Sequence, residues 1–242
     1  MKCLKDINHS EKIYSKIASK PGDYKKKMIV NNIETIVLDA DNVILEKISP
    51  KIITFLKELS GKPEEEIKSI RKKYWEQTKI GAITEEENWL GRKDEEGFRK
   101  GIFGELNISK EKYTDFIGKL RESYRLNEGA IDFLDELKQK KYNLCLFSNS
   151  SYETIERAYL HFKLDSYFKF AFFSHKLKVA KPDSRTFDIL IKKANLITEE
   201  TLFVDDKEKN IITAKEFKFQ TFLFKGVKDF NEILKYLSER TP

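Results

Sequence analysis

TIVLDADNVIL, residues 35–45, sets an apolar run directly against two carboxylates. Thr35 to Leu38 have the β-branched and aliphatic side chains of a buried strand, and Asp39 and Asp41 follow at its end. Two like charges a few ångströms apart repel each other, and the repulsion grows where water is excluded. We therefore expect the rest of the chain to supply positive charge to this pair.

The chain after residue 126 alternates between strand and helix patterns. Expected strands, with the first at 33–38, follow at 142–147, 168–174, 201–206 and 220–224, and expected helices at 130–140, 152–162, beyond Pro182, 208–217 and 229–238. This alternation predicts an α/β core, a Rossmann-like parallel sheet between two layers of helices. Sheets of this kind hold their functional sites at the carboxyl ends of the strands.

Residues 46–125 have helical periodicity and no strand pattern, which predicts an all-helical insert. One apolar face runs along 49–60, a second helix is expected between Pro63 and Gly81, and a third begins at Thr84, with Glu87 at the capping-box position. A fourth helix is expected from Ser109. The domains are then a basic N-terminal extension (1–32), a core domain (33–45 and 126–242) and a helical insert (46–125).

The charge of the chain is concentrated near its start. Of the net charge of +6, residues 1–32 contribute eight lysines against three acidic residues, and we expect one amphipathic helix there. A local lysine-rich segment of this kind is typical of a solvated helix and argues against a nucleic-acid-binding groove, although a nucleic-acid-facing role of the extension stays open. Two cysteines without metal-ligand spacing, no membrane-length apolar run and no secretory signal predict a cytoplasmic protein.

Polar side chains follow several expected strands at the points where those strands end. In chain order these are Asp39 and Asp41, then Ser148 and Asn149, then Lys181, then Asp205 and Asp206. Clustered aspartates without a soft ligand suit a hard ion, above all Mg²⁺, and a lysine and a hydroxyl offer donors to an anion. The set predicts phosphoryl transfer through a covalent aspartyl phosphate.

The same residues resemble the four motifs of the haloacid dehalogenase-like hydrolase superfamily, which consists mostly of phosphatases. Asp39-Ala40-Asp41-Asn42-Val43 matches the first motif, and Ser148 after LCLF matches the second. Lys181 in VAKPD matches the third, and Asp205-Asp206 in LFVDD matches the fourth. The insert between the first and second motifs resembles the small helical cap of one subgroup. The resemblance covers about residues 33–225.

The resemblance implies a role for each matched residue. Asp39 would attack phosphorus and ligate Mg²⁺, and Asp41 would act as general acid and base, with its backbone carbonyl on the metal. Ser148 and Lys181 would hold the phosphoryl oxygens, with Asn149 positioning the loop or reaching the phosphate. Asp206 would ligate the metal directly, and Asp205 directly or through water. Asn42 departs from the pattern, because many relatives have glycine there.

The second acidic residue, Asp41, favours phosphate esters, because a halide leaves without a proton. The substrate is expected to be a small phosphorylated metabolite, with Trp89, Arg92 and Lys93 of the cap as candidates to contact it. The alternatives are a phosphomutase acting on a sugar phosphate and a non-catalytic regulatory or binding module. The sequence leaves the identity of the ester and the oligomeric state open.

Overall fold

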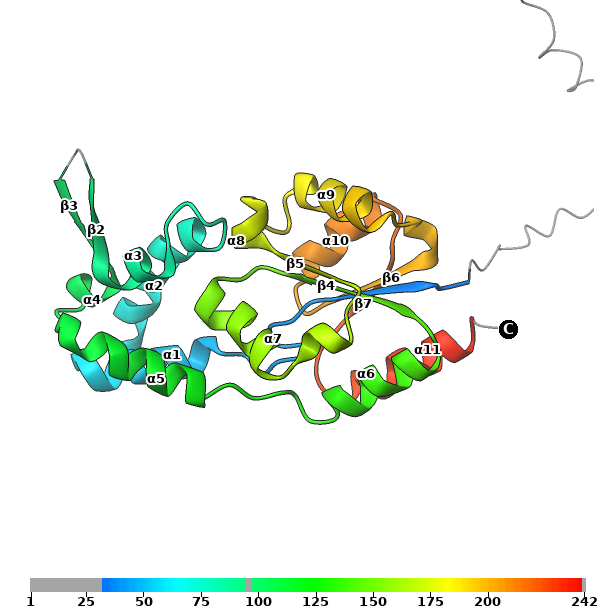
Figure 1. Cartoon of the computed structure of the whole chain (residues 1–242), viewed down its shortest axis with the longest axis horizontal. Helices are drawn as coiled ribbons and strands as arrows, with labels where there is room; N and C mark the ends of the chain where they lie inside the picture. Colours follow the sequence, from blue (N-terminus) through cyan, green and yellow to red (C-terminus); the bar gives the residue numbers. More distant parts are fainter. Residues whose placement is uncertain (1–31, 95–96, 241–242) are drawn as a thin grey trace, which may run out of the picture. The chain divides into compact units, whose positions relative to one another are not determined.

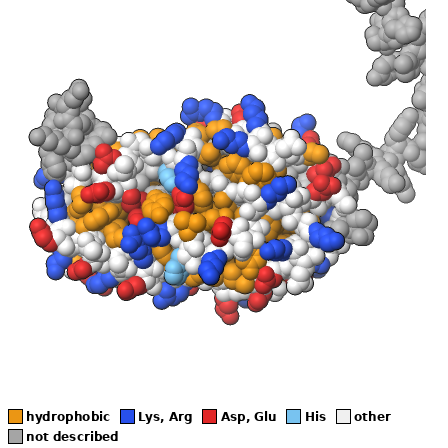
Figure 2. Space-filling model, in the orientation of Figure 1, with side chains coloured by type: hydrophobic (Ala, Val, Ile, Leu, Met, Phe, Trp, Pro, Cys, Tyr) orange, Lys and Arg blue, Asp and Glu red, His pale blue; other side chains and the backbone are white. Residues whose placement is uncertain are grey.

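The computed structural model describes residues 32–94 and 97–240, and the side chains of residues 92–99 lie outside this description. The expected helix in the extension and the side chains of Arg92 and Lys93 therefore fall outside the described part. Among the described residues, no helix combines the length and apolar character that a bilayer crossing requires. On the face drawn in Figure 2, basic and acidic side chains are interspersed.

A five-stranded parallel sheet forms the centre of the fold (Figure 1). Its strand order is β5-β4-β1-β6-β7, so the first strand of the chain lies in the middle. The strands are β1 (Thr35–Leu38), β4 (Asn143–Ser148), β5 (Phe170–Phe173), β6 (Thr201–Asp205) and β7 (Gln220–Leu223). All five were predicted from the sequence, and the Rossmann-like α/β fold is confirmed.

The two faces of the sheet build two separate apolar clusters because successive strand residues point to opposite sides. Ile36 and Leu38 belong to one cluster, whereas Val37 between them belongs to the other. The helices α6 (Ala130–Gln139), α7 (Arg157–His161) and α11 (Asp229–Ser238) cover the first face, and α9 (Ser184–Ala194) and α10 (Glu208–Glu216) cover the second. The core therefore has the expected three layers.

The insert consists mainly of helices. These are α1 (Ser49–Ser60), α2 (Glu64–Thr78), α3 (Glu85–Leu90), α4 (Ile102–Glu105), η1 (Lys110–Lys112) and α5 (Tyr113–Glu122). The predicted capping box of α3 is present, since Glu87 N donates to Thr84 Oγ1 at 3.1 Å and Thr84 N donates to Glu87 Oε2 at 2.6 Å. Trp89 is buried against Phe103 and Phe116, so it builds the core of the insert.

The prediction that the insert is all-helical is wrong in one place. An antiparallel hairpin of β2 (Gly91–Asp94) and β3 (Gly97–Lys100) follows α3. Its sequence, GRKDEEGFRK, contains one apolar side chain, Phe98, and therefore shows no alternation from which a strand could be predicted. The hairpin is defined by the backbone pairing of β2 with β3 and not by a side-chain pattern.

Four further short segments complete the core around the strand ends. The π-helical turn η2 (Tyr152–Glu156) follows β4 and leads into α7, and α8 (Ser174–Leu177) follows β5. The turns η3 (Leu164–Ser166) and η4 (Thr198–Glu200) precede β5 and β6. The predicted helix at 152–162 is thus present, with its first turn wound as a π-helix.

Candidate active site

The carboxylate of Asp39 lies at the carboxyl end of the central strand and is almost completely buried. Only 2% of the residue is exposed, and its backbone N–H donates to Val204 O of β6 at 2.9 Å, which continues the sheet past β1. One carboxylate oxygen accepts from Ala40 N at 2.8 Å. Burial raises the pKa of Asp39 to about 7, and the nearby Lys181 opposes that rise.

Lys181 supplies the positive charge that the aspartates require. Its ammonium donates to Asp205 Oδ2 at 2.6 Å and to Phe147 O at 2.5 Å, and it lies 3.2 Å from Asp39 Oδ1. The lysine is 1% exposed, and its ammonium lies 4.9 Å from the ring centroid of Phe147. A single buried cation therefore bridges the ends of β1 and β6, two of the predicted motifs.

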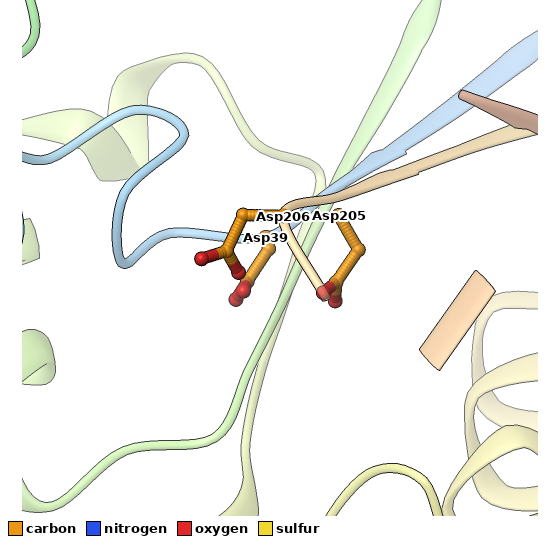
Figure 3. A group of neighbouring side chains, drawn as sticks. All are labelled: Asp39, Asp205 and Asp206. Carbon is orange, nitrogen blue, oxygen red and sulfur yellow. The ribbon is translucent and has the colours of Figure 1, made fainter. Parts of the chain in front are cut away.

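Asp39, Asp205 and Asp206 place one carboxylate oxygen each within 4.8 Å of one another (Figure 3). The two members of the acidic pair have different surroundings. Both oxygens of Asp205 are occupied, by Lys181, by Asn210 Nδ2 at 2.8 and 2.9 Å, and by Lys207 N at 2.9 Å. Asp206 Oδ1, in contrast, is buried and accepts no hydrogen bond, with Lys207 Nζ at 3.7 Å.

These residues fit a hard divalent cation. Three carboxylates face two lysines, Lys181 and Lys207, so one negative charge remains uncompensated, and the orphaned oxygen of Asp206 has the character of a metal ligand. The donor set consists of oxygen atoms, which is the set that Mg²⁺ prefers. Within the acidic pair, Asp206 Oδ1 is the oxygen that no hydrogen bond occupies, so it is the one available to a cation, and its role as a ligand stays a prediction.

Asp41 lies apart from the three clustered carboxylates and lines a cavity of about 400 Å³. Its Oδ1 accepts from Ile48 N at 3.4 Å. Burial raises the pKa of Asp41 above its usual range, and the positive charge of Lys207 opposes that rise. A carboxyl group with a raised pKa beside a cavity is suited to hold and release a proton.

Ser148 and Asn149 lie at the end of β4, beside β1. Ser148 is fully buried. The amide of Asn149 makes a reciprocal pair with the backbone of Lys181, since its Nδ2 donates to Lys181 O at 2.7 Å and its Oδ1 accepts from Lys181 N at 2.8 Å. Asn149 also lines the cavity. Its side chain thus fixes the loop that carries the lysine.

Three residues near this site were not predicted from the sequence. Asn42 adopts the left-handed conformation, with φ of 67°, and its Nδ2 donates to Asp206 Oδ2 at 3.1 Å. Asn210, in the first turn of α10, donates from its Nδ2 to both oxygens of Asp205. Burial works against the charge of Lys207, but the four aspartates nearby outweigh it and raise the pKa of this lysine. The signal available for Lys207 was its place directly after Asp205-Asp206.

The buried carboxylates, the bridging lysine and the adjoining cavity lie together at the carboxyl ends of parallel strands, where α/β enzymes hold their active sites. The chain belongs to the haloacid dehalogenase-like hydrolase family, whose model matches residues 33–218.

One curated relative matches part of this chain. A D-ribitol-5-phosphate phosphatase of Bacteroides thetaiotaomicron is 42% identical over 59 residues, which is 24% of this chain. The match spans 29% of that relative's length.

Solved structures of the haloacid dehalogenase (HAD) family share the fold. A family enzyme from Bacteroides thetaiotaomicron, crystallised with magnesium and inorganic phosphate, has a TM-score of 0.66 at 21% identity, over 84% of this chain and 99% of that one. A HAD-like hydrolase from Porphyromonas gingivalis has a TM-score of 0.64 at 22% identity, over 85% of this chain and 98% of that one.

Proposed function

We propose that this hydrolase is a Mg²⁺-dependent phosphatase that cleaves a small phosphate monoester through an aspartyl phosphate on Asp39. The observation that carries the proposal is the division of the aspartates into two environments. Asp39 and Asp206 share a buried site with Lys181, whereas Asp41 faces the adjoining cavity. The nucleophile must be ionised when it attacks, which Lys181 and a bound cation would favour at Asp39, whereas the proton donor must reach the leaving group, as Asp41 can from the cavity.

In the first half of the reaction, a carboxylate oxygen of Asp39 forms a bond to phosphorus and the bond from phosphorus to the ester oxygen breaks. Asp41 donates its proton to that leaving oxygen, so the alcohol departs neutral. Lys181 stabilises the charge on Asp39 and on the transferring oxygens, and the Ser148 hydroxyl, at the end of β4, is the proposed second donor to them. Mg²⁺, when held by Asp39 and Asp206, supplies positive charge that favours the ionised carboxylate and the phosphoryl oxygens.

In the second half, the now ionised Asp41 accepts a proton from water while the water oxygen forms a bond to phosphorus. The bond from phosphorus to Asp39 breaks, and inorganic phosphate leaves. The enzyme returns to its starting protonation state, and the net reaction is ester plus water to alcohol plus phosphate. Burial of Asp39 excludes other water from the carboxylate before the ester binds.

Relatives support this proposal without deciding the substrate. One related enzyme of this fold was crystallised with magnesium and inorganic phosphate, the proposed cofactor and product. The curated relative is named for a phosphorylated polyol, a small phosphate monoester.

The test is release of inorganic phosphate from para-nitrophenyl phosphate and from a panel of metabolite phosphates, with and without Mg²⁺. Asp39→Asn is the inactive reference. Asp188→Asn is the matched control, because Asp188 is an exposed residue of α9. We expect Mg²⁺-dependent release that Asp39→Asn abolishes and Asp188→Asn retains. Release that is independent of Mg²⁺ or unaffected in Asp39→Asn would refute the mechanism.

The phosphomutase alternative predicts a different fate for the phosphoryl group. A mutase would return the phosphoryl group to its sugar and accumulate a bisphosphate, whereas a phosphatase passes it to water. Incubation with a ³²P-labelled sugar phosphate, followed by separation of the products, distinguishes the two. Label in free phosphate alone supports the phosphatase, and label in a sugar bisphosphate supports the mutase.

A further inference from the structure

The cavity beside Asp41 carries much more positive charge than one phosphoryl group requires. Five cationic side chains line it, against the one carboxylate of Asp41. They are Lys47, Lys68, Arg71, Lys72 and Lys207. The cavity lies between the insert, which contributes α1 and α2, and the core, which contributes Asn149, Thr154 and Ile155. It is therefore the space into which the leaving group of the proposed reaction extends.

Three of these cations share one face of α2. Lys68, Arg71 and Lys72 are followed by Trp75, at spacings of three, four and seven residues, so all four side chains project from the same side of the helix. All four line the cavity. Like charges at these spacings destabilise an isolated helix, and an anion bound between them would relieve the repulsion.

Arg71 is the most deeply placed of the three. Its Nη1 donates to Ser49 Oγ at 2.8 Å and to Ser49 O at 3.5 Å, both of which are neutral acceptors. Burial lowers the pKa of Arg71 to about 10, while Asp41 and Glu85 act in the opposite direction from beyond ion-pair distance. A largely desolvated guanidinium held by neutral partners is costly unless an anion joins it.

Lys72 is exposed at the mouth of the same cavity. Within the described part of the chain the structure records no ion pair for Lys72, whereas its neighbours Lys68 and Lys73 pair with Glu64 and Glu105. Among the described residues, neither Arg71 nor Lys72 thus forms an ion pair with a carboxylate, although Asp41 and Glu85 act on Arg71 from a greater distance.

The phosphoryl group of the substrate does not account for these cations. In the proposed reaction it lies against Asp39, where Lys181 and the divalent cation balance its charge, and Lys207 stands beside Asp206 at that end. Arg71 and Lys72 come from the insert, on the leaving-group side of Asp41. Their charge is therefore available to a second part of the substrate.

Resting on the proposed function, we propose that the preferred substrate is a phosphate monoester whose leaving group carries a second anionic group, a carboxylate or a phosphate, bound by Arg71 and Lys72. Trp75, Ile53 and Ile155 supply apolar surface to the carbon skeleton between the two anions. A polyol phosphate, whose leaving group is uncharged, would leave the guanidinium of Arg71 without a counter-charge and would bind more weakly. The cavity of about 400 Å³ suits a metabolite of this size.

The experiment compares matched substrate pairs. Phosphoglycerate and glycerol phosphate differ in a carboxylate, and fructose bisphosphate and fructose phosphate differ in a second phosphate. We expect kcat/KM to favour the member with the additional anionic group in at least one pair by about 10- to 100-fold, mainly through KM. The pair that shows the preference identifies which second anion the cavity accepts.

Variants test whether Arg71 and Lys72 cause the preference. Arg71→Gln and Lys72→Gln should each reduce the preference by about tenfold, through a higher KM for the ester that carries the second anion. Lys73→Gln is the matched control, because Lys73 lies on another side of the same helix, paired with Glu105. Lys72 is exposed, so Lys72→Gln keeps the test decisive even if Arg71→Gln fails to fold.

The outcomes separate this inference from the proposed function. Suppose that hydrolysis of para-nitrophenyl phosphate depends on Mg²⁺ and that kcat/KM is equal or higher for the esters that lack the second anion. This result would overturn the second-anion site and leave the phosphatase standing. A preference that survives both glutamine variants would also overturn it. No metal-dependent hydrolysis of any monoester would instead remove the proposed function on which the inference depends.

Discussion

The aspartates of this site lie in different environments. Asp41 faces a cavity and has a raised pKa, whereas Asp205 is held by four hydrogen bonds from three residues. Identical side chains can therefore serve as a proton donor and as a fixed counter-charge. The sequence positions alone do not distinguish these uses.

Asp41→Asn should slow ester cleavage by about 10²–10⁴-fold on alkyl phosphates, because the leaving alkoxide then lacks its proton donor. Formation of the phosphoenzyme from para-nitrophenyl phosphate should be less affected, since that leaving group departs without a proton. Hydrolysis of the phosphoenzyme should still be slow, so the phosphoenzyme accumulates. Acid-quenched single-turnover measurements with ³²P-labelled substrate would detect it, and equal losses on aryl and alkyl esters without accumulation would contradict the acid–base role.

Lys181→Met should destabilise the metal-free protein by about 3–5 kcal/mol, because it leaves Asp39 and Asp205 buried without their shared cation. The free energy of unfolding would be measured by urea titration in the presence of a chelator. Lys73→Met provides the comparison, since its exposed pair with Glu105 contributes about 1 kcal/mol or less. A similar small loss for both variants would show that Lys181 does not hold the site together.

At the level of elements, the contact of α3 with the segment after β4 connects the insert to the core. Glu85 of α3 accepts from Trp89 Nε1 at 2.9 Å and lies beside Ser151 and Glu153 at the start of η2. Burial raises the pKa of Glu85 above its usual value of 4.5. A carboxylate at this junction is costly to keep ionised.

This raised pKa gives the stability a definite pH dependence. The folded state binds the proton of Glu85 more tightly than the unfolded state does. The favourable contribution of this proton to the free energy of unfolding is therefore complete below pH 4.5, and it is lost as the pH rises through the folded-state pKa of Glu85. Glu85→Gln should therefore be as stable as the wild type or more so at neutral pH, with a flatter profile between pH 4.5 and 7. Urea midpoints across this range would measure it, with exposed Glu86→Gln as the control. A marked loss of stability in Glu85→Gln at neutral pH would show that ionised Glu85 is required.

The predictability of the elements followed the strength of their side-chain patterns. The helices α1 and α11 have the predicted bounds because their apolar faces are buried and therefore strongly patterned. The hairpin β2–β3 was missed because its polar sequence carries no such pattern. Asp39 and Asp206 were predictable because each follows a buried strand. The cationic face of α2 was not, since it gains meaning only when the insert and the core enclose a cavity.

On the scale of the whole molecule, the fold brings residues more than 160 positions apart into one acidic cluster, and Asn42 and Asp206 are separated by 164 positions. The central place of β1, with β4 and β6 on its two sides, makes this possible. Such a cluster exists in the folded state alone, so a cation that binds it stabilises folding rather than the unfolded chain.

Mg²⁺ should therefore raise the melting temperature in a concentration-dependent way. A concentration 100-fold above Kd corresponds to ~2.7 kcal/mol, and each kcal/mol shifts the melting temperature of a protein of this size by ~2–4 °C. Asp206→Asn should abolish most of the shift, because it replaces the orphaned buried oxygen and its charge. Glu208→Gln removes an exposed carboxylate two residues later and should leave the shift intact.

Differential scanning fluorimetry with Mg²⁺ against K⁺ at equal ionic strength separates binding from screening. An equal shift in wild type and Asp206→Asn would place the cation elsewhere, whereas a shift confined to proteins that retain Asp206 would tie metal binding to the strand ends where the aspartates meet.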